Sequence, residues 1–278
     1  MRKLLSIVAV LGIVAGLSQA VNASPEQDLK EMRATFKKMF PNVPFAEYGN
    51  GVYALDAESR AQWETIEDFP PYELSIENGK KLFNTPFANG KTFASCFPNN
   101  GIGIRQNYPL FDTKKGELVT IEGAINACLK ANGEKTLKDG KGDLADISSY
   151  MSFTSRGKII NVVIPNDPRA VAAYERGKQH FYAKRGQLNL ACADCHVSSA
   201  GKHVRADLLS PMLGHTTHFP VYRSQSGDMN TLHRRYEGCN EQVRAKPYAL
   251  QSDEYKALEY FETYMSNGLA INGPSSRK

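Results

Sequence analysis

The sequence has no long apolar run after its first 23 residues, no fibrous repeat and no dense stripe of Lys and Arg. The lack of a second apolar run excludes a membrane-spanning segment in the mature chain. A formal net charge of +5 and a pI of about 8.8 exclude the strongly basic surface of a nucleic-acid-binding protein. With 41% hydrophobic residues among 278, the composition excludes a disordered chain and allows one large or two small globular domains.

The first 23 residues have the pattern of a signal peptide. Met1-Arg2-Lys3 is a short cationic region, and residues 4–17 form an apolar run too short to span a bilayer comfortably. Small residues in Val21-Asn22-Ala23 predict cleavage after Ala23, with Ser18-Gln19-Ala20 as a second site and an uncleaved anchor as the alternative. The mature protein is therefore expected in the periplasm, where disulfide bonds persist.

The strongest motif is Cys192-Ala193-Asp194-Cys195-His196, the C-x-x-C-H pattern of covalent haem c attachment. Two thiols on one helical turn can both add to the vinyl groups of one porphyrin, and the adjacent imidazole supplies the proximal iron ligand. A thioredoxin-type motif would follow a strand, whereas the preceding segment, residues 169–178, has a helical pattern. A zinc site would need a second Cys/His pair at ligand spacing, and none is clear. We predict one haem c, bound through Cys192, Cys195 and His196.

Two stretches of the chain share one pattern, which indicates a repeated unit. Glu77-Asn78-Gly79-Lys80-Lys81-Leu82-Phe83 precedes Cys96, and Glu175-Arg176-Gly177-Lys178-Gln179-His180-Phe181 precedes Cys192. Each unit closes with a helical pattern, over residues 144–152 and 258–266, which is the layout of a class I cytochrome c. Chance similarity of two helical stretches is the alternative. We expect a mostly α fold of two tandem class I cytochrome c-like domains, over residues 71–165 and 166–278, after an N-terminal extension over residues 24–70.

The first unit lacks the residues that would bind haem. Cys96 is followed by Phe97-Pro98-Asn99-Asn100, so the second thiol and the imidazole are both missing. We therefore expect a haem-less first domain. Cys96 and Cys128 are then two thiols in an oxidising compartment, which favours a disulfide between them, the alternative being that one stays free.

Cys239 is left without a partner and lies in the region where a class I cytochrome supplies its distal iron ligand. Its neighbours are His233-Arg234-Arg235-Tyr236-Glu237-Gly238-Cys239-Asn240, and nearby cations favour the reactive thiolate form of a cysteine. The residues alone leave other distal ligands open: Met212, Met229, His203, His215, His218 and His233. A methionine ligand would indicate an ordinary electron carrier.

The degenerate first unit, the Cys192–His196 motif and the Arg234–Asn240 segment together resemble the A-subunit family of the SoxAX cytochromes of bacterial sulfur oxidation. The resemblance covers nearly the whole mature chain. It implies an L-cysteine S-thiosulfotransferase, which joins thiosulfate oxidatively to a cysteine of a SoxYZ-type carrier protein and passes electrons to haem. It further implies the one-haem form, a SoxX-type cytochrome subunit in a heterodimer, and no nucleic-acid partner.

The same resemblance assigns roles to two residues. Cys239 is implied to be catalytic, to bind the haem iron and to carry an extra sulfur as a persulfide, and Arg235 to bind substrate. If the segment is helical, Arg235 and Cys239 lie four residues apart on one face, and Arg234 points elsewhere.

Lys202, Arg205 and Arg223 are expected to form the basic rim of a channel for the carrier. A non-catalytic electron-transfer cytochrome and a pure binding subunit are the alternative functions.

Overall fold

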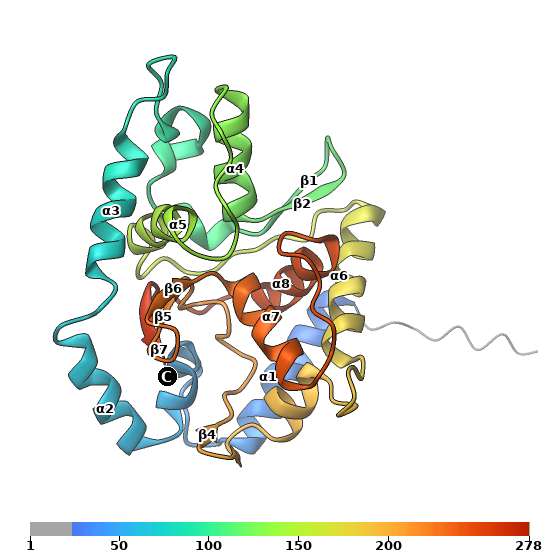
Figure 1. Cartoon of the computed structure of the whole chain (residues 1–278). Helices are drawn as coiled ribbons and strands as arrows, with labels where there is room; N and C mark the ends of the chain where they lie inside the picture. Colours follow the sequence, from blue (N-terminus) through green and yellow to red (C-terminus); the bar gives the residue numbers. More distant parts are fainter. Residues whose placement is uncertain (1–23, 278) are drawn as a thin grey trace, which may run out of the picture.

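The computed structural model describes residues 24–277, so the predicted signal peptide and its cleavage site after Ala23 lie outside the described residues. Figure 1 shows two helical domains, one above the other, with the N-terminal segment wrapped around the lower one. Both domains are cytochrome c-like, as expected. No helix within residues 24–277 is long and apolar enough to cross a membrane.

The first domain consists of three α-helices and a short hairpin. Its elements are α3 (Glu73–Asn84), three short helical turns η2 (Phe93–Cys96), η3 (Pro98–Gly101) and η4 (Arg105–Asn107), strands β1 (Leu110–Asp112) and β2 (Glu117–Val119), α4 (Ile121–Ala131) and α5 (Asp143–Phe153). Thr120 begins α4 by accepting a hydrogen bond from the Gly123 amide, which satisfies one of the free amides of the helix start. Cys96 in η2 and Cys128 in α4 form the expected disulfide.

The second domain contains the haem motif and a small sheet. Its elements are α6 (Pro168–Tyr182), the short turn η5 (Asp194–Ser198), hairpin strands β3 (His203–Val204) and β4 (Asp207–Leu208), strands β5 (Val221–Arg223) and β6 (Asp228–Asn230), α7 (Leu232–Gln242), α8 (Asp253–Met265) and β7 (Ser275–Arg277). The sheet has the order β6-β5-β7, with β5 antiparallel to β6 and parallel to β7.

Each domain is built around one pair of crossed helices, α3 with α5 and α6 with α8. The repeated glycines lie at these crossings. A Cβ on Gly79 would lie 1.9 Å from the Asp146 carbonyl oxygen, and one on Gly177 would lie 2.0 Å from that of Ala257. Only glycine allows the two backbones to approach so closely. The shared sequence pattern therefore marks the same packing contact in both domains.

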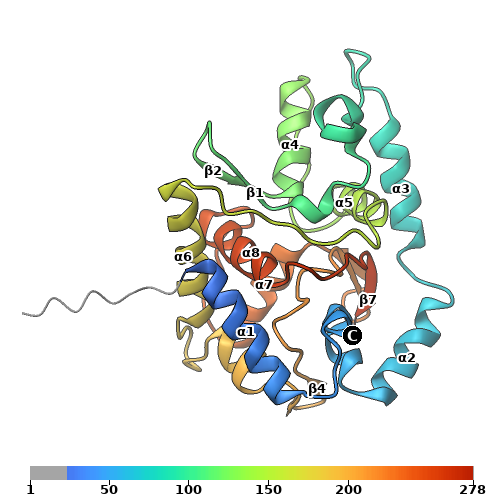
Figure 2. The same ribbon diagram turned by 180° about the vertical axis from the view of Figure 1, so that it is seen from behind.

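The N-terminal extension consists of α1 (Pro25–Met39), η1 (Phe45–Ala54) and α2 (Ala57–Glu67), and it packs on the second domain. Met32 and Phe36 of α1 belong to the core of that domain, and α1 lies across α8 in Figure 2. Asp28 accepts hydrogen bonds from the Tyr174 hydroxyl at 2.8 Å and from Lys178 Nζ at 2.7 Å. The extension is thus an integral part of the haem domain's core.

The two domains also share buried contacts. Phe111 and Leu118, on the β1–β2 hairpin of the first domain, belong to the core of the second. Between the domains, Arg105 Nη2 lies 3.5 Å from Glu259 Oε1, and both side chains are fully buried. The first domain is therefore firmly packed against the helix α8 that supports the functional site.

Candidate functional site

The Cys192–His196 motif forms a helical turn that is fixed by its own third residue. Asp194 Oδ2 accepts a hydrogen bond from the Ala191 amide at 2.7 Å and pairs with Lys184 Nζ at 2.6 Å. The amide of Ala191 and the ammonium of Lys184 hold the pKa of Asp194 below its ordinary value. Cys192 and Cys195 are both free thiols, as attachment of a porphyrin requires.

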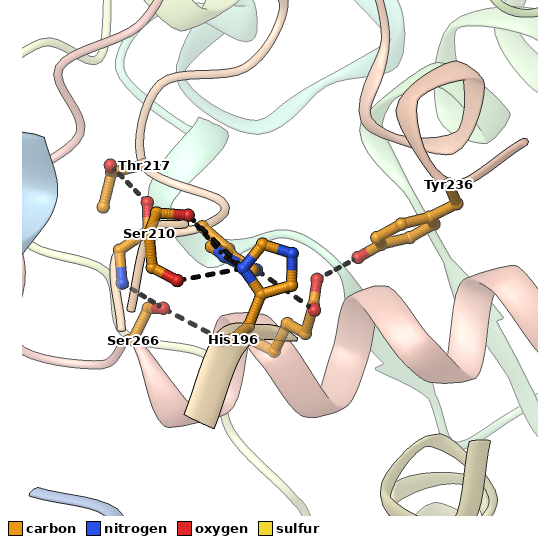
Figure 3. Close-up of polar contacts among 8 residues, drawn as sticks. His196, Ser210, Thr217, Tyr236 and Ser266 are labelled. Carbon is orange, nitrogen blue, oxygen red and sulfur yellow. Dashed lines mark hydrogen bonds and ion pairs between the residues drawn. The ribbon is translucent and has the colours of Figure 1, made fainter. Parts of the chain in front are cut away.

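His196 is held in the orientation that an iron ligand needs. Its Nδ1 donates to the Ser210 carbonyl oxygen at 2.9 Å, as Figure 3 shows. Burial, and then the neighbouring His215, lower the pKa of His196 well below its ordinary value, so the ring is neutral. Among the described residues no hydrogen bond uses Nε2, so this atom is left for a metal.

Four residues around His196 were not identified from the sequence in these roles: Ser210, His215, Tyr236 and Glu262. His215 Nε2 lies 3.0 Å from His196 Nδ1, and the Glu262 carboxylate contacts both His215 and Tyr236. The sequence contains one sign of the role of Glu262: the residue lies on the apolar face of a helical pattern, together with Leu258 and Phe261. A carboxylate at such a position indicates a buried polar contact.

Helix α7 carries Arg235 and Cys239 four residues apart, and the charges of both residues act on the haem motif. Burial, Glu262 and then the Cys239 thiol raise the pKa of Cys192. Burial and Cys239 likewise raise the pKa of Cys195, and Arg235 is among the charges that act on His196. The helix therefore places both residues beside the C-x-x-C-H turn.

The neighbouring Arg234 points away from this site. Its Nη1 pairs with Glu237 Oε2 at 2.7 Å, one helical turn further along α7. This pair agrees with the expectation that Arg234 points elsewhere than Arg235 and Cys239.

A second arginine, Arg223 on β5, faces the same region. Burial, and then Arg235, lower the pKa of Arg223 to about 10, while Cys239 opposes this effect. Among the described residues neither Arg223 nor Arg235 donates a side-chain hydrogen bond or forms an ion pair. Of the other residues expected at a channel rim, Lys202 and Arg205 are exposed at the β3–β4 hairpin.

The two methionines that rivalled Cys239 as distal ligand are placed elsewhere. The Met212 amide donates to the His196 carbonyl, and Met212 directly follows the Ser210 segment that holds His196 Nδ1, so it lies behind the imidazole. Met229 packs against Tyr72 of the first domain. Because side chains alternate along a strand, Met229 on β6 shares the face of its partner Tyr222, opposite to that of Arg223.

The remaining histidines have other surroundings. His203 is exposed on β3, whereas His233 Nε2 pairs with Glu259 Oε2 at 3.0 Å. His218 is stacked on Phe219, and burial lowers its pKa well below the ordinary value.

Comparison with known proteins agrees with this arrangement. The model of the SoxA/TsdA cytochrome c domain matches residues 78–160 and 176–271, once in each helical domain. The chain belongs to the SoxA/TsdA cytochrome c family. The resemblance inferred from the sequence is thereby confirmed, and both halves of the chain carry the family's domain.

Several relatives and one solved structure support the family assignment. L-cysteine S-thiosulfotransferase subunit SoxA of Allochromatium vinosum is 51% identical over 99% of this chain and 98% of that protein. The subunit of the same name from Chlorobaculum tepidum is 55% identical over 91% and 88%. The crystal structure of SoxXA from P. pantotrophus contains a chain with a TM-score of 0.71 and 33% identity, covering 78% of this chain and 84% of that one.

Proposed function

We propose that the chain is the A subunit of an L-cysteine S-thiosulfotransferase, which joins thiosulfate to a cysteine of a carrier protein. The observation that carries this proposal is the free thiol of Cys239, held on α7 beside both the haem motif and two arginines without partners. Relatives with the same name and similar length support it. A simple electron carrier has no need of this thiol.

The donor set fits one haem c. Two free thiols three residues apart, Cys192 and Cys195, would form the thioether bonds, and His196 would bind the iron through Nε2. Cys239 would be the second residue of this chain to bind the iron. The haem supplies an acceptor for the electrons that the reaction releases.

The first domain supports the count of one haem. All six histidines of the chain lie at or beyond residue 180, so this domain has no imidazole. Its core is filled by packed aromatic rings, among them Phe83, Phe87 and Phe93, and Cys96 is held in the disulfide with Cys128.

Arg235 and Arg223 are suited to bind thiosulfate. Thiosulfate is a dianion, and the planar guanidinium groups present forks of donors that match its oxygens. Neither group forms an ion pair with a carboxylate among the described residues, and Asp207 is the carboxylate that acts on Arg223 from a distance. The two arginines come from α7 and β5 and would orient the terminal sulfur toward Cys239.

The reaction forms one S–S bond between thiosulfate and a thiol, and it releases two electrons and the thiol proton. In a two-step route the Cys239 thiolate would first form an S–S bond to thiosulfate, giving Cys239–S–S–SO3⁻ and two electrons. The carrier thiolate would then attack the sulfur of the bound thiosulfate and release Cys239 as a thiolate. One haem accepts one electron, so a second haem protein is required. A SoxX-type cytochrome is the proposed partner, because a similar chain occurs in the SoxXA structure. A SoxYZ-type carrier is proposed to supply the cysteine, and the periplasm is the proposed compartment.

Low-temperature EPR of the oxidised protein, with haem content measured on the same sample, tests the proposal. We expect one haem per chain and a low-spin signal of thiolate ligation that is lost in Cys239→Met, together with thiosulfate-dependent turnover. Met229→Leu is the matched control, since Met229 packs against the first domain, and it should keep both properties. A His/Met-type signal in the wild type would instead indicate an electron-transfer cytochrome.

A further inference from the structure

A buried carboxylate lies close to the haem motif without an obvious structural need. Glu262 is on α8, and its side chain is 3% exposed. One oxygen, Oε2, accepts the hydroxyl hydrogen of Tyr236 at 2.5 Å, and the other lies 3.3 Å from His215 Nδ1. This carboxylate therefore joins Tyr236 to His215, the imidazole next to His196.

The donors and acceptors fix the direction of this chain of contacts. Burial and the Glu262 carboxylate raise the pKa of Tyr236 well above its ordinary value, so the phenol keeps its proton and donates. A carboxylate only accepts, so His215 must donate from Nδ1. Nε2 of His215 then has a lone pair that faces two donors, Nδ1 of His196 at 3.0 Å and the Ser210 hydroxyl at 3.1 Å. The His196 proton is thus shared with the Ser210 carbonyl, and its Nε2 stays free.

The negative charge of this carboxylate is not balanced by a basic side chain. Glu259, one turn earlier on α8, pairs with Arg105 and His233. By contrast, no lysine or arginine within residues 24–277 forms an ion pair with Glu262, and the imidazole in contact with its carboxylate is that of His215. The charge therefore acts along the hydrogen bonds toward His196.

A carboxylate that accepts from the far nitrogen of a metal-binding imidazole increases the basicity of that ligand. Hydrogen bonding around the axial ligands is one of the means by which a protein sets a haem potential. Here the effect would pass through a second imidazole, that of His215. The Ser210 carbonyl alone would suffice to orient His196, so the His215–Glu262 contact adds charge and not merely orientation.

The other end of the chain reaches the helix of the proposed catalytic residues. Tyr236 lies on α7, next to Arg235 and three residues before Cys239. Its hydroxyl bond to Glu262 is buried and holds α7 against α8. The Glu262 carboxylate thus contacts both His215, which is next to His196, and helix α7, which carries Cys239.

We propose that Glu262 is a positioning residue that lowers the reduction potential of the haem through His215 and His196 and anchors α7 through Tyr236. This inference rests on the proposed function, because it requires haem ligation by His196. A low potential makes the reduced haem a stronger donor, which favours passage of its electron to the partner cytochrome.

Redox titration of the covalently bound haem, followed by its absorption and EPR spectra, tests this relay. Glu262→Gln keeps the shape and removes the charge, and we expect the midpoint potential to rise. His215→Leu should raise it as well. The double variant should match the His215 variant alone, because the charge no longer reaches His196. Glu237→Gln is the matched control: Glu237 pairs with Arg234 on the same helix α7, and the potential should not change.

An unchanged potential in Glu262→Gln would overturn the proposal. The proposal would also be overturned if the shifts in midpoint potential of Glu262→Gln and His215→Leu added fully in the double variant, because the charge of Glu262 would then act without His215. Should Glu262→Gln fail to fold, His215→Gln replaces it, and an unchanged potential in that folded variant would be equally decisive. A wild-type protein without covalent haem would refute the proposed function itself, which the haem content reports before any variant is compared.

Discussion

Replacing Gly177 by alanine tests whether the crossing of α6 and α8 sets the stability of the haem domain. The new methyl carbon would lie 2.0 Å from the Ala257 carbonyl oxygen and 2.6 Å from its carbon. Both are backbone atoms, so no side chain can rotate away. An ordinary contact of 3.4 Å requires the helices to separate by about 1.4 Å at this point.

The expected cost follows from two opposing terms. Overpacking costs about 1–3 kcal/mol, and the upper end applies because the obstacle is backbone. Alanine has the higher helix propensity, so replacing glycine by alanine stabilises the helix itself by about 1 kcal/mol. The net loss in the free energy of unfolding is about 2 kcal/mol, which corresponds to a fall in Tm of about 4–8 °C for a protein of this size.

Thermal unfolding, followed by circular dichroism, measures this loss. Gly79→Ala repeats the test in the first domain, where the Asp146 carbonyl oxygen would be 1.9 Å away. Gly238→Ala is the control, since its nearest obstacle is Arg235 Nη1 at 4.0 Å, and it should raise Tm slightly. If the Tm of Gly177→Ala equalled or exceeded that of the wild type, the proposed role of the close helix crossing would be wrong.

The disulfide, one buried imidazole and one arginine give three further tests. Replacing Cys96 and Cys128 together by serine should lower the free energy of unfolding by about 3–4 kcal/mol in urea titrations, without loss of haem. Burial lowers the pKa of His180 from 6.5 to about 4, so stability should fall as pH drops from about 6.5 to about 4, and His180→Gln should reduce that slope by the share that His180 contributes. Arg223→Gln should raise the KM for thiosulfate about tenfold to a hundredfold, whereas Arg234→Gln should leave it unchanged.

The spacing of residues over short stretches of the sequence determined much of the fold and of the candidate site. The haem motif, the repeated glycine pattern and the two closing helices are short-range features, and the structure contains two cytochrome c-like domains built on those helix pairs. The spacing of Arg235 and Cys239 likewise became one face of α7, because helical periodicity is a local property. The loss of the second thiol after Cys96 was enough to predict its disulfide with Cys128.

Only the tertiary structure decided which distant residues complete the site. The sequence left Met212, Met229 and Cys239 as rivals, and the chain path places the methionines behind the imidazole and against the first domain. Ser210, the partner of His196, comes from a loop 14 residues further along the chain, and Glu262, the partner of His215, comes from helix α8. Hydrogen-bond partners of this kind are chosen by packing, and periodicity carries no information about them.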